Sequence, residues 1–316
     1  MMIRTVALNP AIDQTVMVPR LEPGEVIRAS ATRQDPGGKA VNVASCLADW
    51  GVKVVVTGLL GRDNAASFEQ LFAAKGIADR MIRVAGSTRT NIKILEDGGR
   101  TTDVNLPGFA ARPEDTKAVF NQLDTVATGD LVVVSGSQPQ GLAPDTTARL
   151  VADLAGRGAR VVLDVSGEPL AQALAGAVMP HAVKPNRHEL EALVGRSLAE
   201  PTALLAAARD LLDRGIALVT VSMGAEGALF VTRAGALVAQ PAEVATGSSV
   251  GAGDAMVAGL TAGLAEGLAL PDLARQATAF AGAKLRNPGA HLPPQAEVRA
   301  LAARIVTAPA AEYAAG

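Results

Sequence analysis

A glycine-rich turn that runs into a helix is the sharpest chemical signal in this chain of 316 residues. Residues 246–254 read TGSSVGAGD, and residues 255–267 then carry apolar side chains at helical spacing. Gly251 and Gly253 let the backbone approach a ligand closely, and the first N–H groups of a helix have no partner inside it. This arrangement favours a bound anion. Asp254, at the same helix end, either caps the helix or performs chemistry beside that anion.

Three further polar segments lie at turns and helix starts, where a ligand could bind. Residues 36–42 (PGGKAVN) form a glycine turn before a helix-like stretch, and residues 222–227 (SMGAEG) directly follow a buried strand. In residues 184–190 (KPNRHEL), Asn186 and Glu189 have the spacing of a capping box. Each segment also has a purely structural interpretation, as a turn or a helix cap. The position of residues 222–227 favours function, because ligands of parallel α/β sheets bind beyond the carboxyl ends of the strands.

Other catalytic patterns fit the sequence poorly. Residues 247–251 match the G-x-S-x-G elbow of serine hydrolases with Ser249 as nucleophile, but no strong strand precedes them and only His291 follows. The phosphate-binding P-loop pattern fails because Gly38-Lys39 is followed by Ala40. Zinc-type spacing is lacking among the three histidines and the single cysteine, which are His181, His188, His291 and Cys46.

Composition narrows the class of protein. Hydrophobic residues make up 49% of the chain and charged residues 19%, which is ordinary for a globular protein and excludes disorder. The net charge of -2 gives no reason to expect nucleic acid or an anionic membrane as a partner. One cysteine cannot form an internal disulfide, and no stretch approaches the roughly 20 apolar residues of a membrane helix. We therefore expect a soluble, cytoplasmic protein.

Alternating strands and helices predict the frame that must position these segments. Residues 146–156 read as a helix between two buried strands, and one such βαβ unit takes about 30 residues. The apolar runs that read as buried strands are residues 53–57, 131–134, 160–164, 181–184 and 217–221. The fold class is therefore predicted to be α/β, with a parallel sheet covered by helices on both faces.

Two regions break this rhythm and predict a small antiparallel sheet inserted into the α/β body. The strand-like segments are residues 5–18, residues 26–32 and a hairpin over residues 89–106, with the turn signal DGG at its centre. Side-chain alternation along the hairpin predicts one polar face that carries Arg89, Asn91 and Lys93. Such a face is either simply solvated or the inner side of a lid over a polar ligand.

In this order the segments resemble the ribokinase-like sugar kinases, in their phosphofructokinase B branch and most closely its bacterial 1-phosphofructokinases. The resemblance covers nearly the whole chain. Its motifs are residues 9–13 (NPAID), 37–44 (GGKAVNVA), 135–137 (SGS), 184–190 (KPNRHEL) and 251–254 (GAGD). Two small departures, Ala40 for the usual glycine and Ser249 for the usual threonine, are expected to leave activity intact.

The resemblance implies a three-layer α/β sandwich, formed by residues 1–316 as a single domain with a lid sheet at about residues 10–34 and 88–107. It implies ATP-dependent phosphorylation of fructose 1-phosphate to fructose 1,6-bisphosphate, with Mg²⁺ as cofactor. Phosphorylation of tagatose 6-phosphate or fructose 6-phosphate is the alternative within the family. A regulator that binds a sugar phosphate without catalysis is a more distant one. The implied partners are ATP, the phosphosugar and a second copy of the chain paired through the lid, with no nucleic acid and no membrane.

Residue roles follow from the same resemblance. Asp254 is the expected base, and the N–H groups after Gly251, those of Ala252, Gly253 and Asp254, form the expected anion hole. The phosphosugar is expected at Asp13, Gly37, Gly38, Lys39, Asn42, Asn91 and Ser137, with its phosphate on Arg89 and Lys93. ATP is expected at Lys184, Asn186, Ser222, Met223, Gly224, Ala225, Glu226, Gly227, Ser249, Gly253 and Asn287. Mg²⁺ is expected to be held, through water, by Asn186 and Glu189.

Overall fold

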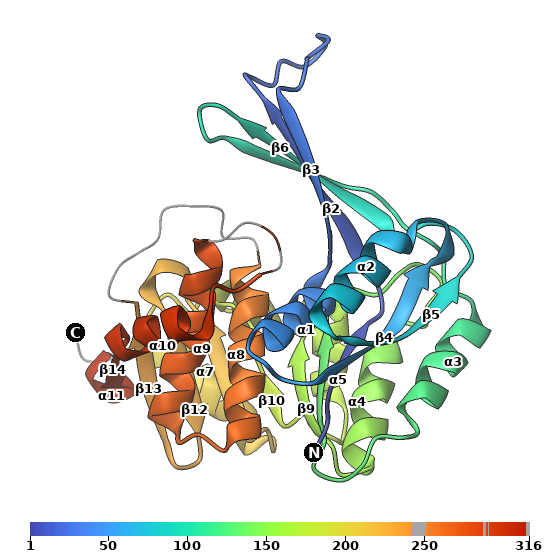
Figure 1. Ribbon diagram of the computed structural model, residues 1–316. Coiled ribbons are helices and arrows are strands. Elements are labelled where there is room, and N and C mark those ends of the chain that lie inside the picture. The colour runs from blue at the N-terminus through green and yellow to red at the C-terminus, as the bar shows by residue number, and fades with distance from the viewer. Residues whose placement is uncertain (242–250, 287–288, 290, 314–316) are drawn as a thin grey trace.

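A ten-stranded sheet forms the centre of the molecule in the computed structural model, which describes residues 1–241, 251–286, 289 and 291–313 (Figure 1). Its order is β14-β13-β12-β11-β10-β9-β8-β1-β4-β5. Pairing is parallel from β5 to β11 and antiparallel from β11 to β14, which confirms the predicted α/β class with a mostly parallel sheet. The strands are β1 (Ile3–Ala7), β4 (Val54–Gly61), β5 (Ala78–Val84), β8 (Leu131–Ser135), β9 (Arg160–Asp164), β10 (Ala182–Val183), β11 (Leu218–Ser222), β12 (Ala228–Thr232), β13 (Gly235–Gln240) and β14 (Val306–Pro309).

Helices cover both faces of this sheet, and each face has its own apolar core. One core is built with α1 (Lys39–Asp49), α2 (Ala66–Lys75), α8 (Ala252–Glu266), α9 (Leu270–Leu285) and α10 (Gln295–Arg304). The other is built with α3 (Pro113–Leu123), α4 (Thr146–Gly156), α5 (Glu168–Ala175), α6 (Arg187–Val194) and α7 (Pro201–Asp213). Short elements complete the body: η1 (Arg62–Asn64), η2 (Gly224–Glu226) and α11 (Ala310–Tyr313). None of the helices in the described ranges is both long and apolar enough to cross a bilayer.

A separate four-stranded sheet projects from the body above α1 and α2 (Figure 1). We call it the lid. Its order is β3-β2-β6-β7, with β2 and β6 parallel and the outer pairs antiparallel. The prediction of an antiparallel sheet is therefore wrong for the central pair, because the chain crosses the body between β3 and β6 and returns in the direction of β2. Its strands are β2 (Ala11–Val18), β3 (Ala31–Gly37), β6 (Arg89–Glu96) and β7 (Thr101–Asn105).

The second lid strand in chain order, β3, lies later in the chain than the sequence pattern predicts. A strand is expected over residues 26–32, but the structure forms β3 at Ala31–Gly37, and Val26 is 95% exposed outside it. The pattern treats Pro36 and Gly37 as breakers. Because β3 is an edge strand of the lid, the missing N–H of Pro36 does not interrupt the sheet.

Candidate active site

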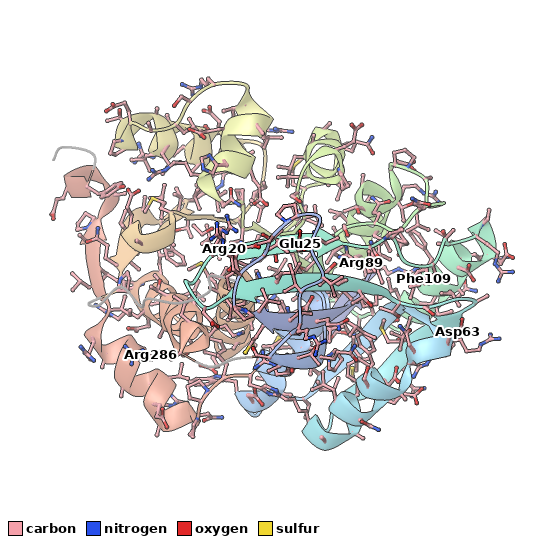
Figure 2. All side chains as sticks on the ribbon, turned by 90° about the horizontal axis from the view of Figure 1, so that it is seen from above. Arg20, Glu25, Asp63, Arg89, Phe109 and Arg286 are labelled. Atoms are coloured by element: carbon pink, nitrogen blue, oxygen red, sulfur yellow. The ribbon has the colours of Figure 1, made fainter. Side chains whose placement is uncertain are left out.

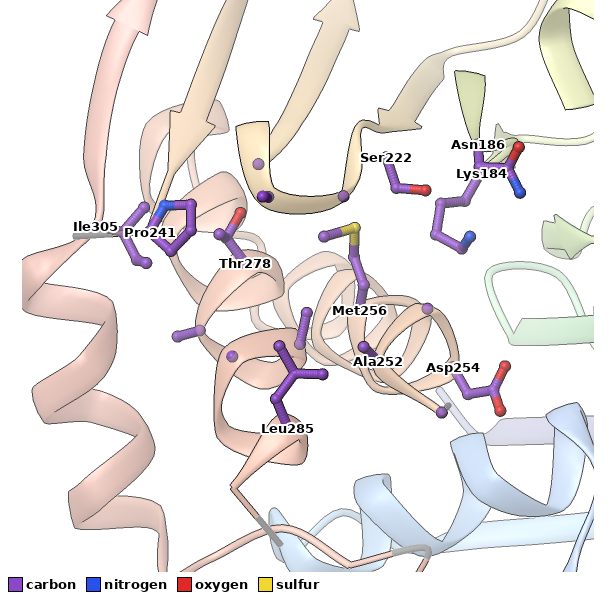
Figure 3. Close-up of a pocket in the computed structure, with 18 of the residues that line it drawn as sticks. Lys184, Asn186, Ser222, Pro241, Ala252, Asp254, Met256, Thr278, Leu285 and Ile305 are labelled. Atoms are coloured by element: carbon purple, nitrogen blue, oxygen red, sulfur yellow. The ribbon is translucent and has the colours of Figure 1, made fainter. Parts of the chain in front are cut away.

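The carboxyl ends of the parallel strands and the first turn of α8 border a cavity of about 560 Å³ (Figure 3). Lys184, Asn186 and Asp254 lie at one end of it, Met256 lies between the ends, and the apolar side chains of Pro241 and Ile305 lie at the other end. We call this space the strand-end cavity. Its shape and lining suit an elongated ligand with a charged end and an apolar end.

Asp254 lies in the first turn of α8, and Gly251 is the N-cap residue of that helix. Gly251 has a φ of 80°, a left-handed conformation that other residues rarely adopt. Glycine has no side chain to cap the helix, and no side chain among the described residues does so, which leaves the first N–H groups of α8 suited to a ligand. Asn42 Nδ2 on α1 donates a hydrogen bond of 2.8 Å to Asp254 Oδ2. The turn therefore combines an anion site with a fixed carboxylate.

A buried ionic network lies beside this turn. Asp164, the last residue of β9, is 1% exposed and accepts a hydrogen bond of 3.0 Å from Ser135 Oγ. Lys184 Nζ lies 3.2 Å and Lys39 Nζ 3.4 Å from its two carboxylate oxygens. The Lys184 ammonium would also lie 3.5 Å from a Cβ placed on Gly253. The lysines therefore connect a buried carboxylate to the helix end that would bind the anion.

Sequence reasoning missed Asp164. The pattern at residues 160–164 predicts only a buried strand. A charged residue at the carboxyl end of such a strand is the signal that identifies it, because charged side chains are rarely fully buried without a partner.

The two carboxyl groups of the network have opposite pKa shifts. Burial, together with the negative charge of Asp164, raises the pKa of Asp254 to about 6, although Asn42 and the lysines oppose the shift. Burial also acts to raise the pKa of Asp164, but Lys184 and Lys39 outweigh it and hold that pKa below its ordinary value. Two neighbouring carboxyl groups with pKa values pushed apart are typical of a site that uses one as a proton acceptor and the other as a fixed charge.

The predicted sugar-binding residues gather where the lid joins the body. Asp13 Oδ1 on β2 accepts a hydrogen bond of 2.9 Å from Asn91 Nδ2 on β6. A Cβ on Gly37 would come within 2.5 Å of Asp13 Oδ2, and Gly38, with φ of 91°, would collide with Pro10. These glycines are therefore required for the turn that brings β3 into α1 against the carboxylate.

The structure separates Arg89 from Lys93, which the family resemblance assigns to one phosphate. Arg89 lines a small cavity of about 180 Å³ with Asn9, Lys39 and Ser137, which we call the lid-base cavity. Figure 2 shows Arg89 on the Phe109 side of the molecule, away from Arg286.

Lys93 lies farther along the lid and forms an ion pair of 2.8 Å with Asp103. It lines a groove of about 560 Å³ between the lid and the end of α9, together with Asp13, Asn42 and Gly251. Although the two side chains share a strand face, four residues of strand span about 13 Å. The two side chains also line different cavities, so we treat Arg89 and Lys93 separately.

The capping box at the start of α6 is confirmed. Asn186 Oδ1 accepts a hydrogen bond of 2.8 Å from the Glu189 N–H, and Glu189 Oε2 accepts one of 2.8 Å from the Asn186 N–H. Both side chains nevertheless line the strand-end cavity. The structural role of the pair therefore coexists with a position that suits a ligand.

Most residues predicted to bind ATP line the strand-end cavity, namely Lys184, Asn186, Ser222, Gly224, Ala225, Gly227 and Gly253. Met223 and Glu226 are not among its lining residues. Met223 is buried, and Glu226 accepts hydrogen bonds from Arg187 and Tyr313. Ser249 and Asn287 lie outside the described residues.

The apolar wall of the cavity, which includes Met256, Leu285 and Ile305, gave no signal in the sequence beyond helical apolar spacing.

The residues at the polar end of the strand-end cavity fit Mg²⁺ brought in with a phosphate ligand. Among the described residues no group of three or more His, Cys, Asp or Glu side chains could enclose a metal by itself. Mg²⁺ is commonly held by one or two carboxylates together with water and substrate phosphates, rather than by an all-protein cage. Glu189 and Asn186 offer such a partial set of oxygen ligands at the cavity wall.

Comparison with known proteins gives a consistent result over nearly the whole chain. A family model described as pfkB family carbohydrate kinase matches residues 6–297. A 1-phosphofructokinase from Xanthomonas campestris pv. campestris is 52% identical, with 96% of each chain covered. A 1-phosphofructokinase from Escherichia coli K12 is 40% identical, with 96% of this chain and 97% of that protein covered.

Among solved structures, phosphofructokinase-2 from Escherichia coli in complex with substrates and products superposes with a TM-score of 0.89 at 30% identity. The match covers 96% of this chain and 99% of that one. Sequence and fold therefore lead to the same group of proteins.

Proposed function

The chain belongs to the pfkB family of carbohydrate kinases, and within it we propose that the protein transfers the γ-phosphoryl group of ATP to fructose 1-phosphate. The product would be fructose 1,6-bisphosphate. One observation carries the proposal: Asp254 lines the strand-end cavity, while Asn42, which holds its carboxylate, lines the groove under the lid. A donor in the first space and an acceptor in the second would meet at the uncapped end of α8.

Asp254 is the base in this proposal. With a pKa of about 6 it is mostly ionised at pH 7.5, yet close enough to that pH to accept a proton readily. The acceptor hydroxyl oxygen bonds to the γ-phosphorus, the bond to the ADP oxygen breaks, and the hydroxyl proton passes to the Asp254 carboxylate. The N–H groups of Ala252, Gly253 and Asp254, with Lys184 beside them, stabilise the negative charge of the phosphoryl group in flight.

The strand-end cavity is the proposed ATP site. Lys184 and the turn formed by residues 222–227 lie at the phosphate end, and Met256 and Ile305 supply an apolar surface for the base. Glu189 and Asn186 would hold Mg²⁺ at that phosphate end, in part through water. When bound, the ion neutralises charge on the β- and γ-phosphates.

The lid-base cavity is the proposed site of the phosphate already on the sugar. Burial lowers the pKa of Arg89 but leaves this strong base charged, and a guanidinium can hold a phosphate through two parallel hydrogen bonds. Lys39 and Ser137 line the same cavity, so a second cation and a hydroxyl would complete the phosphate contacts. The sugar ring would then extend toward Asp13 and Asn42.

The outer face of the lid supports a homodimer as a further part of this proposal. Val16 and Ile94 are register neighbours, as are Ile92 and Val104, and all four lie on the face opposite Lys93. Val104 is 43% exposed. A second copy would cover this apolar face, so Ile94→Lys should convert a dimer into a monomer in sedimentation-velocity measurements.

A cytoplasmic location belongs to the same proposal, because ATP is the donor. Cys46 is buried on α1, and burial raises the pKa of its thiol to about 12. An inert thiol of this kind is compatible with a reducing compartment.

A coupled assay of ATP turnover against a panel of phosphosugars tests the proposed function. The panel contains fructose 1-phosphate, fructose 6-phosphate, tagatose 6-phosphate and unphosphorylated fructose. We expect the highest kcat/KM for fructose 1-phosphate and the lowest for fructose. A higher kcat/KM for fructose 6-phosphate or tagatose 6-phosphate would identify the protein as a kinase of that sugar phosphate instead. If no sugar in the panel were phosphorylated, the kinase assignment would be refuted.

A further inference from the structure

A three-residue junction lies behind the turn that borders the strand-end cavity. Glu226 Oε2 accepts a hydrogen bond of 2.8 Å from Arg187 Nη2 and another of 2.7 Å from the Tyr313 hydroxyl. Glu226 itself is not among the residues that line the cavity. Its side chain is 48% exposed, and its carboxylate is bonded to Arg187 and Tyr313 and does not line the space where a nucleotide would lie.

This junction joins three elements that are far apart in the sequence. Arg187 is the first residue of α6 and follows Asn186 directly, Glu226 is the last residue of η2, and Tyr313 is the last residue of α11. The first two segments also touch through their backbones, because Ser222 N donates a hydrogen bond of 3.1 Å to Pro185 O. The start of α6 and the turn that contains Glu226 are thus linked to α11 through one atom, Glu226 Oε2.

Besides its strands and the bond from Ser222 to Pro185, backbone contacts at the two ends of the turn hold it in place. Met223 N donates a hydrogen bond of 2.9 Å to Gly227 O, which closes the turn on itself. Gly227, with φ of 92°, lies directly against the Ala239 carbonyl, so a side chain there would collide with β13. Between these points Gly224 and Ala225 are exposed and line the cavity. Among the described residues, the hydrogen bonds of the Glu226 side chain with Arg187 and Tyr313 hold this exposed part of the turn.

The C-terminal helix is a firm support for that contact. β14 pairs with β13, and Ala310 at the start of α11 is 2% exposed in the core. The Tyr313 ring packs against the same core, and its hydroxyl lies 3.8 Å from Met223 Sδ. Tyr313 therefore reaches the turn from a fixed element.

The protonation states favour a strong contact. Arg187, and after it Tyr313, hold the pKa of Glu226 below its ordinary value, while burial and then Glu226 raise the pKa of Tyr313. At neutral pH an ionised carboxylate therefore accepts from a protonated phenol. Hydrogen bonds of this charge-assisted kind are stronger than neutral ones.

We propose that Tyr313, acting through Glu226, is a positioning residue for the phosphate-binding turn at residues 222–227. The inference rests on the proposed function, since it takes the strand-end cavity to be the ATP site. Tyr313 touches neither the sugar side nor the base Asp254. Its loss should therefore weaken nucleotide binding and leave both the chemical step and the sugar site unchanged.

Steady-state kinetics of Tyr313→Phe is the primary test. The variant keeps the ring and its packing and removes only the hydroxyl, so KM for ATP and the dissociation constant for ADP should rise about 3- to 10-fold. The kcat value, KM for fructose 1-phosphate and the melting temperature should stay close to those of the wild type. Thr128→Val is the matched control, because it removes another exposed hydroxyl bond, to Arg157 O at 3.1 Å, at a site remote from the cavity.

A double-mutant cycle with Glu226→Gln separates positioning from direct contact. If Tyr313 acts through Glu226, the two substitutions should not add. The dissociation constant for ADP of the double variant should then be no higher than the higher of the two single-variant values. If Glu226→Gln weakens ADP binding while Tyr313→Phe does not, Glu226 contacts the nucleotide directly and the inference fails. It also fails if Tyr313→Phe lowers kcat, both affinities and the melting temperature together, because Tyr313 would then support the fold in general.

Calorimetry with ADP keeps this test apart from the assignment of the sugar. If the wild type turned over no phosphosugar but bound ADP, the proposed activity would fail and the Tyr313 cycle would still be decided by the ADP affinities. If the wild type did not bind ADP at all, both the ATP site and the role of Tyr313 would be refuted.

Discussion

The body and the lid contribute to the candidate site in different ways. On the body side, Asp254, Asp164 and Lys184 are 7%, 1% and 5% exposed, and each charge lies close to the others. On the lid side, Lys93 pairs with an exposed Asp103 in an open groove. Burial shifts the pKa of Asp254 to about 6, a value that a solvated carboxyl would not reach.

This contrast indicates that the body carries the chemical step and that the lid contributes mainly to sugar binding. Breaking one partner of a buried ion pair typically costs about 3–5 kcal/mol, whereas an exposed pair contributes about 0–1 kcal/mol. Changes to the buried charges around Asp254 should therefore impair the chemical step, and changes in the lid should alter which sugar binds and how tightly.

The largest effect is expected for Asp254→Asn. The amide keeps the size and can keep a hydrogen bond to Asn42, but it cannot accept the hydroxyl proton, so kcat should fall by about 10²-fold or more. The affinity for ATP should stay the same or rise slightly, because a negative charge leaves the phosphate site. Activity near that of the wild type would reduce Asp254 to a structural residue.

The same variant should be more stable than the wild type. The pKa of Asp254 is higher in the folded state than its ordinary value of 3.8, so the ionised form opposes folding above pH 6. Removing that charge should raise the free energy of unfolding at pH 7.5 by about 1–3 kcal/mol. In chemical denaturation the difference between the two proteins should shrink as the pH falls from 6 toward 4.

The next largest effect is expected for Arg89→Ala, at the base of the lid. Loss of a charged hydrogen bond to phosphate costs about 1.5–3 kcal/mol, so kcat/KM for fructose 1-phosphate should fall by roughly 10- to 150-fold. KM for ATP should hardly change, and unphosphorylated fructose should be affected far less. Lys93→Met is the matched control, because Lys93 lies in the other space, and it should change kcat/KM only a few-fold. Equal losses for ATP and both sugars would mean that Arg89 acts through lid closure.

A smaller effect is expected for Glu189→Gln. The amide can preserve the capping bond to the Asn186 N–H but lacks the negative charge that favours Mg²⁺. The Mg²⁺ concentration for half-maximal rate should rise by roughly 10- to 100-fold, as is typical when an outer partner of a metal is removed. An unchanged Mg²⁺ titration would leave Glu189 with its capping role alone.

The parts of the site that the sequence predicts are those set by local backbone chemistry. The uncapped turn at Gly251 and the capping box of Asn186 and Glu189 need only a few adjacent residues, and both occur in the structure. The alternation of strands and helices likewise predicts the parallel sheet, because each unit is contained in about 30 residues.

The parts that the sequence leaves open depend on contacts between distant residues. Asp164 acquires its role only when β9 meets Lys39 and Lys184, which no local pattern encodes. Strand alternation correctly puts Arg89 and Lys93 on one face, but it carries no information about which cavity each one enters. In the same way Glu226 reads as a ligand residue until α11 brings Tyr313 behind it.

The pH dependence of kcat tests the central claim most directly, because it reports the group that titrates in the enzyme–substrate complex. The ionised form of Asp254 is the active one, so kcat of the wild type and of Arg89→Ala should both fall as the pH drops through about 6. The phosphosugar also ionises near pH 6, but it does so equally in every variant. The residual kcat of Asp254→Asn should therefore decrease less at low pH than kcat of the wild type, because the variant has no base to protonate. An identical low-pH decline in Asp254→Asn and the wild type would contradict the account.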